Sequence, residues 1–427
     1  MKSLKEIYQD NEERNFIDPS LYSRYRVKAG LRNDNGTGVK VGLTKICDVI
    51  GYKFIHEKKY NIDGQLIFRG YPINYLVDKQ PKDKICGFEE TAYLLIFGSL
   101  PTPSQLKEFR DYLLNFKMGP VDLQYETPNI LNALQIEVLK LYAKDPSADT
   151  DDLEERMIKG LNILASIPLF TFSYARNKVF KAYPYPERSL AENILCMARG
   201  NEDYTYEEAR IMDTLLMVHA DHGGGNNSTF ANVVISSTGT DIYSCISAAI
   251  GSLKGPRHGG ANCKVTNMFK AIFHEVGFTT DRATLKKIAN RLLDKDFFDH
   301  SGLIYGIGHA IYTKSDPRCL LIQQQCEALA KSKGQEEIYN CIHIFEEVAV
   351  EVMKERKGID VCANVDYYSG YVYSLLGIES DLFTPLFAIS RTAGWVSHHL
   401  ENRQSNRKLI RPANVYVGEM EEIKWVL

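Results

Sequence analysis

The sequence lacks several features that would place it in a special class of proteins. Its formal net charge is only −3, so it offers no basic field for nucleic acid or an anionic membrane. No apolar run reaches the roughly 18 residues that a membrane-spanning helix needs. It shows no fixed-period repeat, low-complexity stretch or long linker, which argues against a solenoid or a disordered chain. We therefore expect a soluble globular protein that partners neither nucleic acid nor membrane.

The cysteines lack a pattern too. There are nine, an odd number, and no two form a Cys-x-x-Cys pair. They are scattered among apolar residues, so we interpret them as reduced core cysteines rather than disulfide partners or metal ligands. The first residues, MKSLKEIYQDNEERNF, contain no apolar stretch, so we expect neither a secretory signal nor a transit peptide. Both observations predict a cytoplasmic location.

What the sequence does contain is a strong helical pattern. With 427 residues, 44% of them apolar, the chain can build a sizeable core in one large domain or two. Residues 39–73 predict short strands with a hairpin turn at Asp63-Gly64. Apolar spacing of three and four then predicts about a dozen helices almost to the end of the chain, which makes the fold mainly α with a short N-terminal β-hairpin region. These helices are expected at residues 88–98, 103–117, 128–143, 152–178, 187–199, 205–219, 241–254, 264–277, 283–295, 317–332, 335–356, 364–376 and 383–403.

Histidines gather at glycine-rich breaks between the predicted helices. The breaks lie at residues 223–225, 255–260 and 302–308. Loops held between rigid helices are where catalytic side chains concentrate. The histidines in or beside the breaks are His219, His222, His258 and His309.

The first break follows His219-Ala-Asp-His222. Two histidines three residues apart beside an aspartate suit zinc, but the sequence names no third ligand. A metal site here would make the protein a His/Asp metal-dependent hydrolase. A capping loop with satisfied histidines and a polar anion-binding loop are the alternatives.

His258 lies in Gly255-Pro-Arg-His-Gly-Gly260, just before a predicted helix. The positive end of a helix disfavours imidazolium, and a neutral histidine can donate a hydrogen bond to a developing enolate oxygen. The alternative is a helix–helix corner with a bystander histidine.

His309 is followed by Ser315-Asp-Pro-Arg318. Asp316 is predicted as an N-cap and Pro317 as the first helical residue, which places Arg318 in the first turn. A carboxylate there would meet an arginine fork and free backbone N–H groups. His309 could polarise a ketone that the arginine holds. A capped helix with a solvated arginine is the alternative.

Asp366 lies in the otherwise apolar and aromatic segment Ala363-Asn-Val-Asp-Tyr-Tyr-Ser-Gly370. Desolvation raises the pKa of a carboxyl group and makes it a better proton acceptor, although an ordinary capping aspartate would give the same pattern.

Arg391 lies in an apolar helix, where an arginine is rare without an anionic partner. Together with Arg318 and Arg411, it could hold a tricarboxylate.

These motifs resemble those of the Si-type citrate synthases in order and approximate spacing. The resemblance extends to Asp63-Gly-Gln-Leu-Ile-Phe-Arg-Gly-Tyr71, Phe88-Glu-Glu-Thr-Ala-Tyr-Leu-Leu95 and Arg411-Pro. The resemblance covers nearly the whole chain. It implies an almost wholly helical fold in which a small domain, about 258–371, is inserted into a large one, about 1–257 plus 372–427. It also implies an active-site cleft that closes on the oxo acid.

The resemblance further implies the reaction, the condensation of acetyl-CoA with oxaloacetate to give citrate and CoA, a step of the tricarboxylic acid cycle. Asp366 would remove the methyl proton, His258 would donate to the thioester oxygen, and His309 would polarise the ketone. No metal or redox cofactor is expected. The substrate contacts would be His222, Asn226, Arg318, Arg391 and Arg411, with His219 in the same loop.

The family is at least dimeric, so the resemblance implies a homodimer in which Arg411 reaches the partner's active site. The chain resembles the dimeric members rather than the hexameric, NADH-regulated ones. It departs from the family at Gly223, where many members have an acidic residue, and in the loop after His309, which lacks an arginine. Contacts to CoA phosphates are therefore expected from Lys254, Arg257 or Lys314.

Two further readings stay open at this point. A 2-methylcitrate synthase would use propionyl-CoA with the same catalytic residues, and only the acyl pocket decides between the two. A catalytically inactive binding protein is the other, and the intact set of His258, His309 and Asp366 argues against it.

Overall fold

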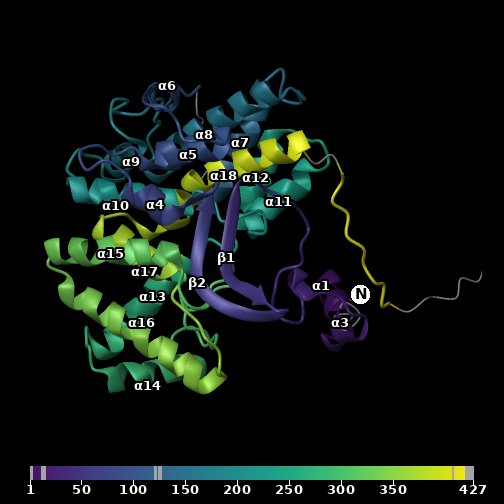
Figure 1. The fold of residues 1–427 in the computed structure, drawn as a ribbon, viewed down its shortest axis with the longest axis vertical. Coiled ribbons are helices and arrows are strands. Elements are labelled where there is room, and N and C mark those ends of the chain that lie inside the picture. The colour runs from purple at the N-terminus through teal and green to yellow at the C-terminus, as the bar shows by residue number, and fades with distance from the viewer. Residues whose placement is uncertain (1–2, 11–15, 120–122, 124–126, 406–407, 419–427) are drawn as a thin grey trace, which may run out of the picture. The chain divides into compact units, whose positions relative to one another are not determined.

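The computed structural model describes residues 3–10, 16–119, 123, 127–405 and 408–418. The described residues form a mainly α structure with one small sheet (Figure 1), as the sequence predicts. They divide into two compact units. One unit comprises Met1–Leu43 and Ile410–Leu427, and contains the helices α1 (Leu4–Asp10) and α3 (Ser20–Arg24) and the 3₁₀ turn Ala29–Leu31. The other, Thr44–Leu409, contains all the remaining elements.

The helices of the larger unit follow the periodicity of the sequence. Every predicted helix has a counterpart whose ends differ by at most three residues. The counterparts are α5 (Gly87–Phe97), α6 (Pro103–Leu114), α7 (Ile130–Lys144), α8 (Leu153–Ala175), α9 (Leu190–Arg199), α10 (Tyr206–His219), α12 (Ile242–Leu253), α13 (Ala261–Val276), α14 (Arg282–Leu293), α15 (Pro317–Ser332), α16 (Glu336–Lys357), α17 (Val365–Leu375) and α18 (Phe383–Ser405).

Two helices of this unit were not predicted. The first is α4 (Ile73–Asp78), a short helix directly after the sheet. The second is α11 (Asn227–Ser236), whose sequence NSTFANVVIS is rich in β-branched and short polar residues. Such residues favour strands and turns, so the local propensity conceals this helix. It forms because it packs along α12 and α18.

The sheet is a long hairpin, β1 (Cys47–Ile55) and β2 (Lys58–Phe68), with the two-residue strand β3 (Tyr71–Pro72) paired to β2 (Figure 1). The predicted turn at Asp63-Gly64 is wrong. The chain turns at His56 and Glu57, both of which have positive φ (45° and 62°).

Asp63 and Gly64 instead lie inside β2. They fall where the pairing of β2 with β1 changes register, between Ile50 and Tyr52 of β1. Gly64 is needed for close approach rather than for a turn. Its N–H donates to the carbonyl oxygen of Ser315 over 3.2 Å, and a Cβ atom at this position would overlap that oxygen. The hairpin therefore packs directly on the loop that leads from His309 to α15.

The core of the larger unit contains polar as well as apolar residues. The central helix α18 packs against α5, α8, α10, α11 and α12, while α13 and α15 pack against α17. Trp395 and Arg391 of α18 are both 0% exposed. A fully buried arginine needs anionic or carbonyl partners, so it marks a polar site inside the packed helices. The predicted boundaries of a small domain at 258 and 371 stay a prediction. No helix in the described ranges is long and apolar enough to cross a membrane.

Candidate active site

The loop after α10 carries the first pair of histidines. Gly223 has a φ of +79°, which lets the chain turn sharply directly after His222. His222 is buried, and its Nε2 has no hydrogen-bond partner among the described residues. Burial, together with the nearby Arg318 and His309, holds the pKa of His222 well below its ordinary value. His222 is therefore neutral, with a ring nitrogen available to a ligand.

His219 is fixed differently. Its Nδ1 lies 2.7 Å from the carbonyl oxygen of Leu215, and burial lowers its pKa to about 3. The neutral ring therefore donates from Nδ1 to that carbonyl. Its own carbonyl oxygen accepts a 2.7 Å hydrogen bond from Nε of Arg391. His219 thus helps to hold an arginine of α18.

His258 lies just before α13, whose N-cap is Gly260. The backbone N–H of Ser228 points at Nε2 of His258 over 3.4 Å, and the Ser228 hydroxyl lies 3.0 Å from the same atom. Trp395 donates from Nε1 to that hydroxyl over 3.2 Å. Burial, reinforced by Arg391, lowers the pKa of His258 to about 4. A neutral ring that accepts at Nε2 carries its proton on Nδ1, so this atom can donate to a substrate oxygen.

His309 has the opposite tautomer. The backbone N–H groups of Ile311 and Tyr312 both donate to its Nδ1, over 3.1 and 3.0 Å. An accepting Nδ1 leaves the proton of the neutral ring on Nε2. The rings of His309 and His222 lie edge to face with centroids 5.1 Å apart. The structure therefore brings together two of the histidines that the sequence singled out.

Arg318 begins α15 as predicted, with Asp316 as N-cap and Pro317 as the first helical residue. Its fork, however, is not fully free. Nε and Nη2 donate to the two carboxylate oxygens of Asp316 over 3.0 and 2.7 Å. Burial lowers the pKa of Arg318, but Asp316 more than offsets this and raises it. Because the paired atoms are Nε and Nη2, a ligand would approach through Nη1.

Asp366 lies in the first turn of α17. The N-cap of this helix is Asn364, whose side chain accepts from the Asp366 N–H over 3.0 Å, so Asp366 is not the capping residue. Its Oδ1 is buried and accepts no hydrogen bond among the described residues. Burial raises the pKa of Asp366 to about 7, even though Arg318 opposes the shift. A carboxyl group with this pKa is suited to proton abstraction near neutral pH.

Arg391 supplies the least satisfied positive charge in the site. Its Nη1 and Nη2 are buried and have no hydrogen-bond partner within the described ranges. Burial lowers its pKa to about 10, so it remains charged at neutral pH. Its guanidinium carbon lies 4.7 Å from the ring centroid of Phe387. A buried guanidinium whose two Nη atoms have no partner among the described residues is suited to bind a carboxylate.

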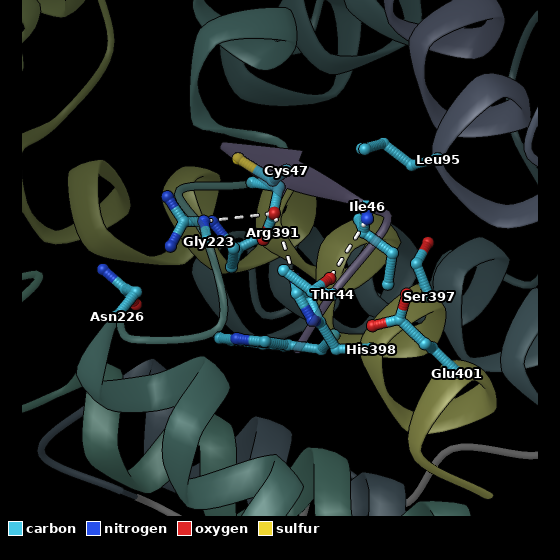
Figure 2. A network of polar contacts seen from close by, with 12 residues as sticks. Thr44, Ile46, Cys47, Leu95, Gly223, Asn226, Arg391, Ser397, His398 and Glu401 are labelled. Carbon is cyan, nitrogen blue, oxygen red and sulfur yellow. Dashed lines mark hydrogen bonds and ion pairs between the residues drawn. The ribbon is translucent and has the colours of Figure 1, made fainter. Parts of the chain in front are cut away.

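Sequence reasoning missed the pair formed by Asp221 and His398. Nε2 of His398 lies 3.1 Å from Oδ2 of Asp221, which also accepts the Gly223 N–H over 3.2 Å. Figure 2 shows His398, Gly223, Cys47 and Arg391 in one polar network. Burial alone would raise the pKa of Asp221, but His398 and Arg391 lower it to about 2. No local pattern marks this pair, because His398 is followed by a second histidine in α18 and its partner is 177 positions away.

The remaining predicted contacts lie towards the surface. Asn226 is the N-cap residue of α11, and its Oδ1 accepts a hydrogen bond from the Ser228 hydroxyl over 3.0 Å. Nζ of Lys254 donates to Oδ1 of Asn132, and Arg257 is exposed. Lys314 is exposed and lines a surface cavity of about 570 Å³. Arg411 belongs to the other compact unit, so its predicted place in the site stays a prediction.

A metal centre at His219 and His222 finds no support. Within the residues that the structure describes, no group of three or more His, Cys, Asp or Glu side chains could hold a metal ion. Asp221, the carboxylate between the two histidines, is instead engaged by His398. The histidine loop therefore lacks the ligand set that a metal-dependent hydrolase needs.

Comparisons with known proteins agree on one family. Residues 33–413 match the family model described as citrate synthase, C-terminal domain. The chain is 36% identical to a citrate synthase of Haloferax volcanii over 84% of this chain and 91% of that protein. It is 33% identical to 2-methylcitrate synthase 1 of Corynebacterium glutamicum, over 83% of this chain and 90% of that protein. A solved structure of the citrate synthase of Thermoplasma acidophilum, with carboxymethyl coenzyme A and oxaloacetate, superimposes on this chain with a TM-score of 0.73. The two sequences are 25% identical, and the superposition covers 94% of this chain and 98% of that one.

Proposed function

This chain belongs to the citrate synthase family, and we propose that it condenses acetyl-CoA with oxaloacetate and hydrolyses the resulting thioester to citrate and CoA. The observation that carries the proposal is the carboxyl group of Asp366. It is buried, its Oδ1 is without a hydrogen bond among the described residues, and its pKa is about 7. A base of this kind is what removal of a weakly acidic methyl proton requires.

The first step forms an enolate. Asp366 takes a proton from the methyl group of the thioester, and the electron pair moves onto the thioester oxygen. His258 is neutral and would donate from Nδ1 to that oxygen as the charge develops. Neither group is sufficient alone, because the carbon acid needs both a proton acceptor and stabilisation of the anion.

The second step forms the carbon–carbon bond. The enolate carbon attacks the ketone of oxaloacetate, and the ketone oxygen gains the electron pair. His309 would donate to this oxygen from Nε2, and Arg318 and Arg391 would hold the carboxylates. Water then cleaves the thioester and releases CoA. His222, Asn226 and Arg411 are proposed as further substrate contacts, and Lys254, Arg257 or Lys314 as contacts to the CoA phosphates.

We also propose that the working protein is a cytoplasmic homodimer in which Arg411 of one protomer completes the site of the other. Closure of the site around oxaloacetate would exclude water before the acyl-CoA reacts. Membership of the family supports the homodimer, and the buried, unpaired atoms of Asp366 and Arg391 support closure around a ligand.

A second candidate substrate is propionyl-CoA, because a relative of similar identity is named 2-methylcitrate synthase. The chemistry is the same, and only the fit of one additional methylene differs. One methylene in a pocket is worth about 1–3 kcal/mol, so the preference is measurable.

The test is CoA release from oxaloacetate with either acetyl-CoA or propionyl-CoA, with the products identified. We expect faster turnover with acetyl-CoA and no effect of a metal chelator. Faster turnover with propionyl-CoA would move the assignment to 2-methylcitrate synthase. Absence of CoA release with both thioesters would contradict either assignment, and loss of activity on chelation would favour a metal-dependent enzyme.

A further inference from the structure

Tyr312 is a buried residue of the loop between His309 and α15. Its side chain is 0% exposed. Its ring stacks on the ring of His309, with centroids 4.6 Å apart and planes inclined by 20°. Parallel stacking at this distance restricts rotation of the imidazole about its side-chain torsions. Tyr312 therefore defines the plane in which the His309 ring lies.

The same ring contacts two other side chains of the site. It meets the ring of His222 edge to face, with centroids 5.7 Å apart. The guanidinium carbon of Arg318 lies 5.9 Å from its centroid. These side chains come from different parts of the chain, so a displacement of Tyr312 would reach all of them.

Tyr312 is itself anchored at both ends. Its backbone N–H donates to Nδ1 of His309, and its hydroxyl donates to the carbonyl oxygen of Gln65 on β2 over 3.1 Å. Burial raises the pKa of Tyr312 above its usual range, so the hydroxyl stays protonated and can donate. The β1–β2 hairpin lies close behind, because Gly51 and Gly64 leave no side chain between it and the loop.

We propose that Tyr312 is a positioning residue for His309, which transmits the rigidity of the β1–β2 hairpin to the imidazole that polarises the ketone. The inference rests on the proposed function, in which His309 donates from Nε2 to oxaloacetate. Tyr312 acts through His309, by holding its ring plane and its tautomer. A donor aimed away from the ketone oxygen would bind the substrate but polarise it less.

The test compares Tyr312→Leu and Tyr312→Phe with Tyr183→Phe as the control. Tyr183 is also buried and donates from its hydroxyl to a backbone carbonyl, that of Ala165 over 2.8 Å, but it contacts none of the site histidines. Polarisation is read from the ¹³C chemical shift of the C2 carbonyl of bound oxaloacetate. Turnover and the Kd of oxaloacetate are measured alongside, with thermal unfolding to establish that each variant is folded.

We expect Tyr312→Leu to lose most of the carbonyl shift on binding and to lower kcat by about ten- to a hundredfold, with a smaller change in Kd. Tyr312→Phe keeps the stacked ring and loses only the anchor, so its loss in kcat should be smaller. Tyr183→Phe should leave both the carbonyl shift and kcat unchanged.

A folded Tyr312→Leu protein that retains the full carbonyl shift and kcat would overturn the inference. Equal losses in kcat for Tyr312→Leu and Tyr183→Phe would also overturn it, because the effect would then be one of stability alone. If the wild-type protein releases no CoA, the proposed function itself fails. The two failures are therefore separate.

Discussion

Two aspartates of the site, Asp366 and Asp316, show how partners decide the role of a carboxylate. Asp316 accepts hydrogen bonds from the Arg318 side chain and from the backbone N–H groups of Arg318 and Val365. It is fully engaged as a structural group. Asp366 is also buried, yet its Oδ1 has no such donor in the described part of the chain. The same residue type is thus a fixed anion at one position and the proposed proton acceptor at the other.

The raised pKa of Asp366 predicts a pH dependence of activity. The base must be ionised, so kcat/KM should rise with pH and reach half its plateau at about pH 7. The pKa of about 10 for Arg391 places the loss of its charge well above this range. The check is a pH profile of CoA release with acetyl-CoA subsaturating. A profile that is flat between about pH 6 and pH 8 would show that another group is the base.

The same shift predicts that Asp366 lowers stability. The pKa of Asp366 is about 7 in the folded protein against an ordinary value of 3.8, so the folded state binds the proton more tightly. The contribution of Asp366 to the free energy of unfolding therefore falls as the pH rises from 3.8 to about 7. Asp366→Asn should raise the free energy of unfolding by an amount on the order of 2–4 kcal/mol above pH 7, and by less at acid pH.

Thermal unfolding of Asp366→Asn and wild type across this pH range measures the effect. The matched control is Asp316→Asn, which should lower stability because it breaks a buried ion pair. A stabilisation by Asp366→Asn that is the same at pH 5 and pH 8 would contradict the linkage.

At the residue scale, the sequence predicted candidate site residues whose catalytic roles stay predictions. Asp366, His258 and His309 stand out because polar groups at glycine-rich breaks or in apolar segments are costly unless they are used. What could not be predicted was their protonation geometry. The opposite tautomers of His258 and His309 depend on backbone N–H groups of Ser228, Ile311 and Tyr312, whose directions only the fold determines.

The β1–β2 hairpin illustrates prediction at the scale of elements. The β-branched stretches in residues 39–73 indicated the strands, and periodicity located the long helices to within a few residues. The turn was misplaced because Asp63-Gly64 has the local chemistry of a turn. Its glycine is required by a contact with Ser315, 251 positions away, which no local pattern contains. The helix α11 was missed for a related reason, because packing overrides its propensity.

Gly64→Ala should therefore disturb the hairpin and the His309 loop together. A Cβ atom would overlap the Ser315 carbonyl and lie 2.7 Å from the Tyr312 ring. We expect destabilisation of about 2–3 kcal/mol and a lower kcat, measured by unfolding and by CoA release. Gly42→Ala is the control, since it has open space around its Cβ. A Gly64→Ala protein with wild-type stability would show that the hairpin does not press on this loop.

At the scale of the whole molecule, the site is assembled from positions that are far apart in the sequence. His222, His258, His309, Asp366 and Arg391 all belong to the larger unit, whereas Arg411 belongs to the other. The proposed homodimer would bring an Arg411 to each site from the partner protomer. The sequence could suggest this only through the resemblance to a family, because a single chain contains no signal for its own partner.

A mixture of two inactive variants tests the shared site. Asp366→Ala and Arg411→Ala should each be nearly inactive. In a mixed dimer, one site would contain both Asp366 and Arg411 and should recover activity, up to about a quarter of the wild-type value for random pairing of equal amounts. The measurement is CoA release after the two proteins are unfolded and refolded together, with separately refolded variants as the control. No recovery in a verified mixed dimer would place Arg411 outside the partner's site.

Asp366 is the proposed acceptor of the methyl proton of the thioester. This role is measured by CoA release from acetyl-CoA and oxaloacetate in wild type and in Asp366→Ala, with folding verified by thermal unfolding. We predict a loss of several orders of magnitude in kcat, about 4 kcal/mol or more in activation free energy. Near-normal turnover in the folded variant would show that Asp366 is not the base.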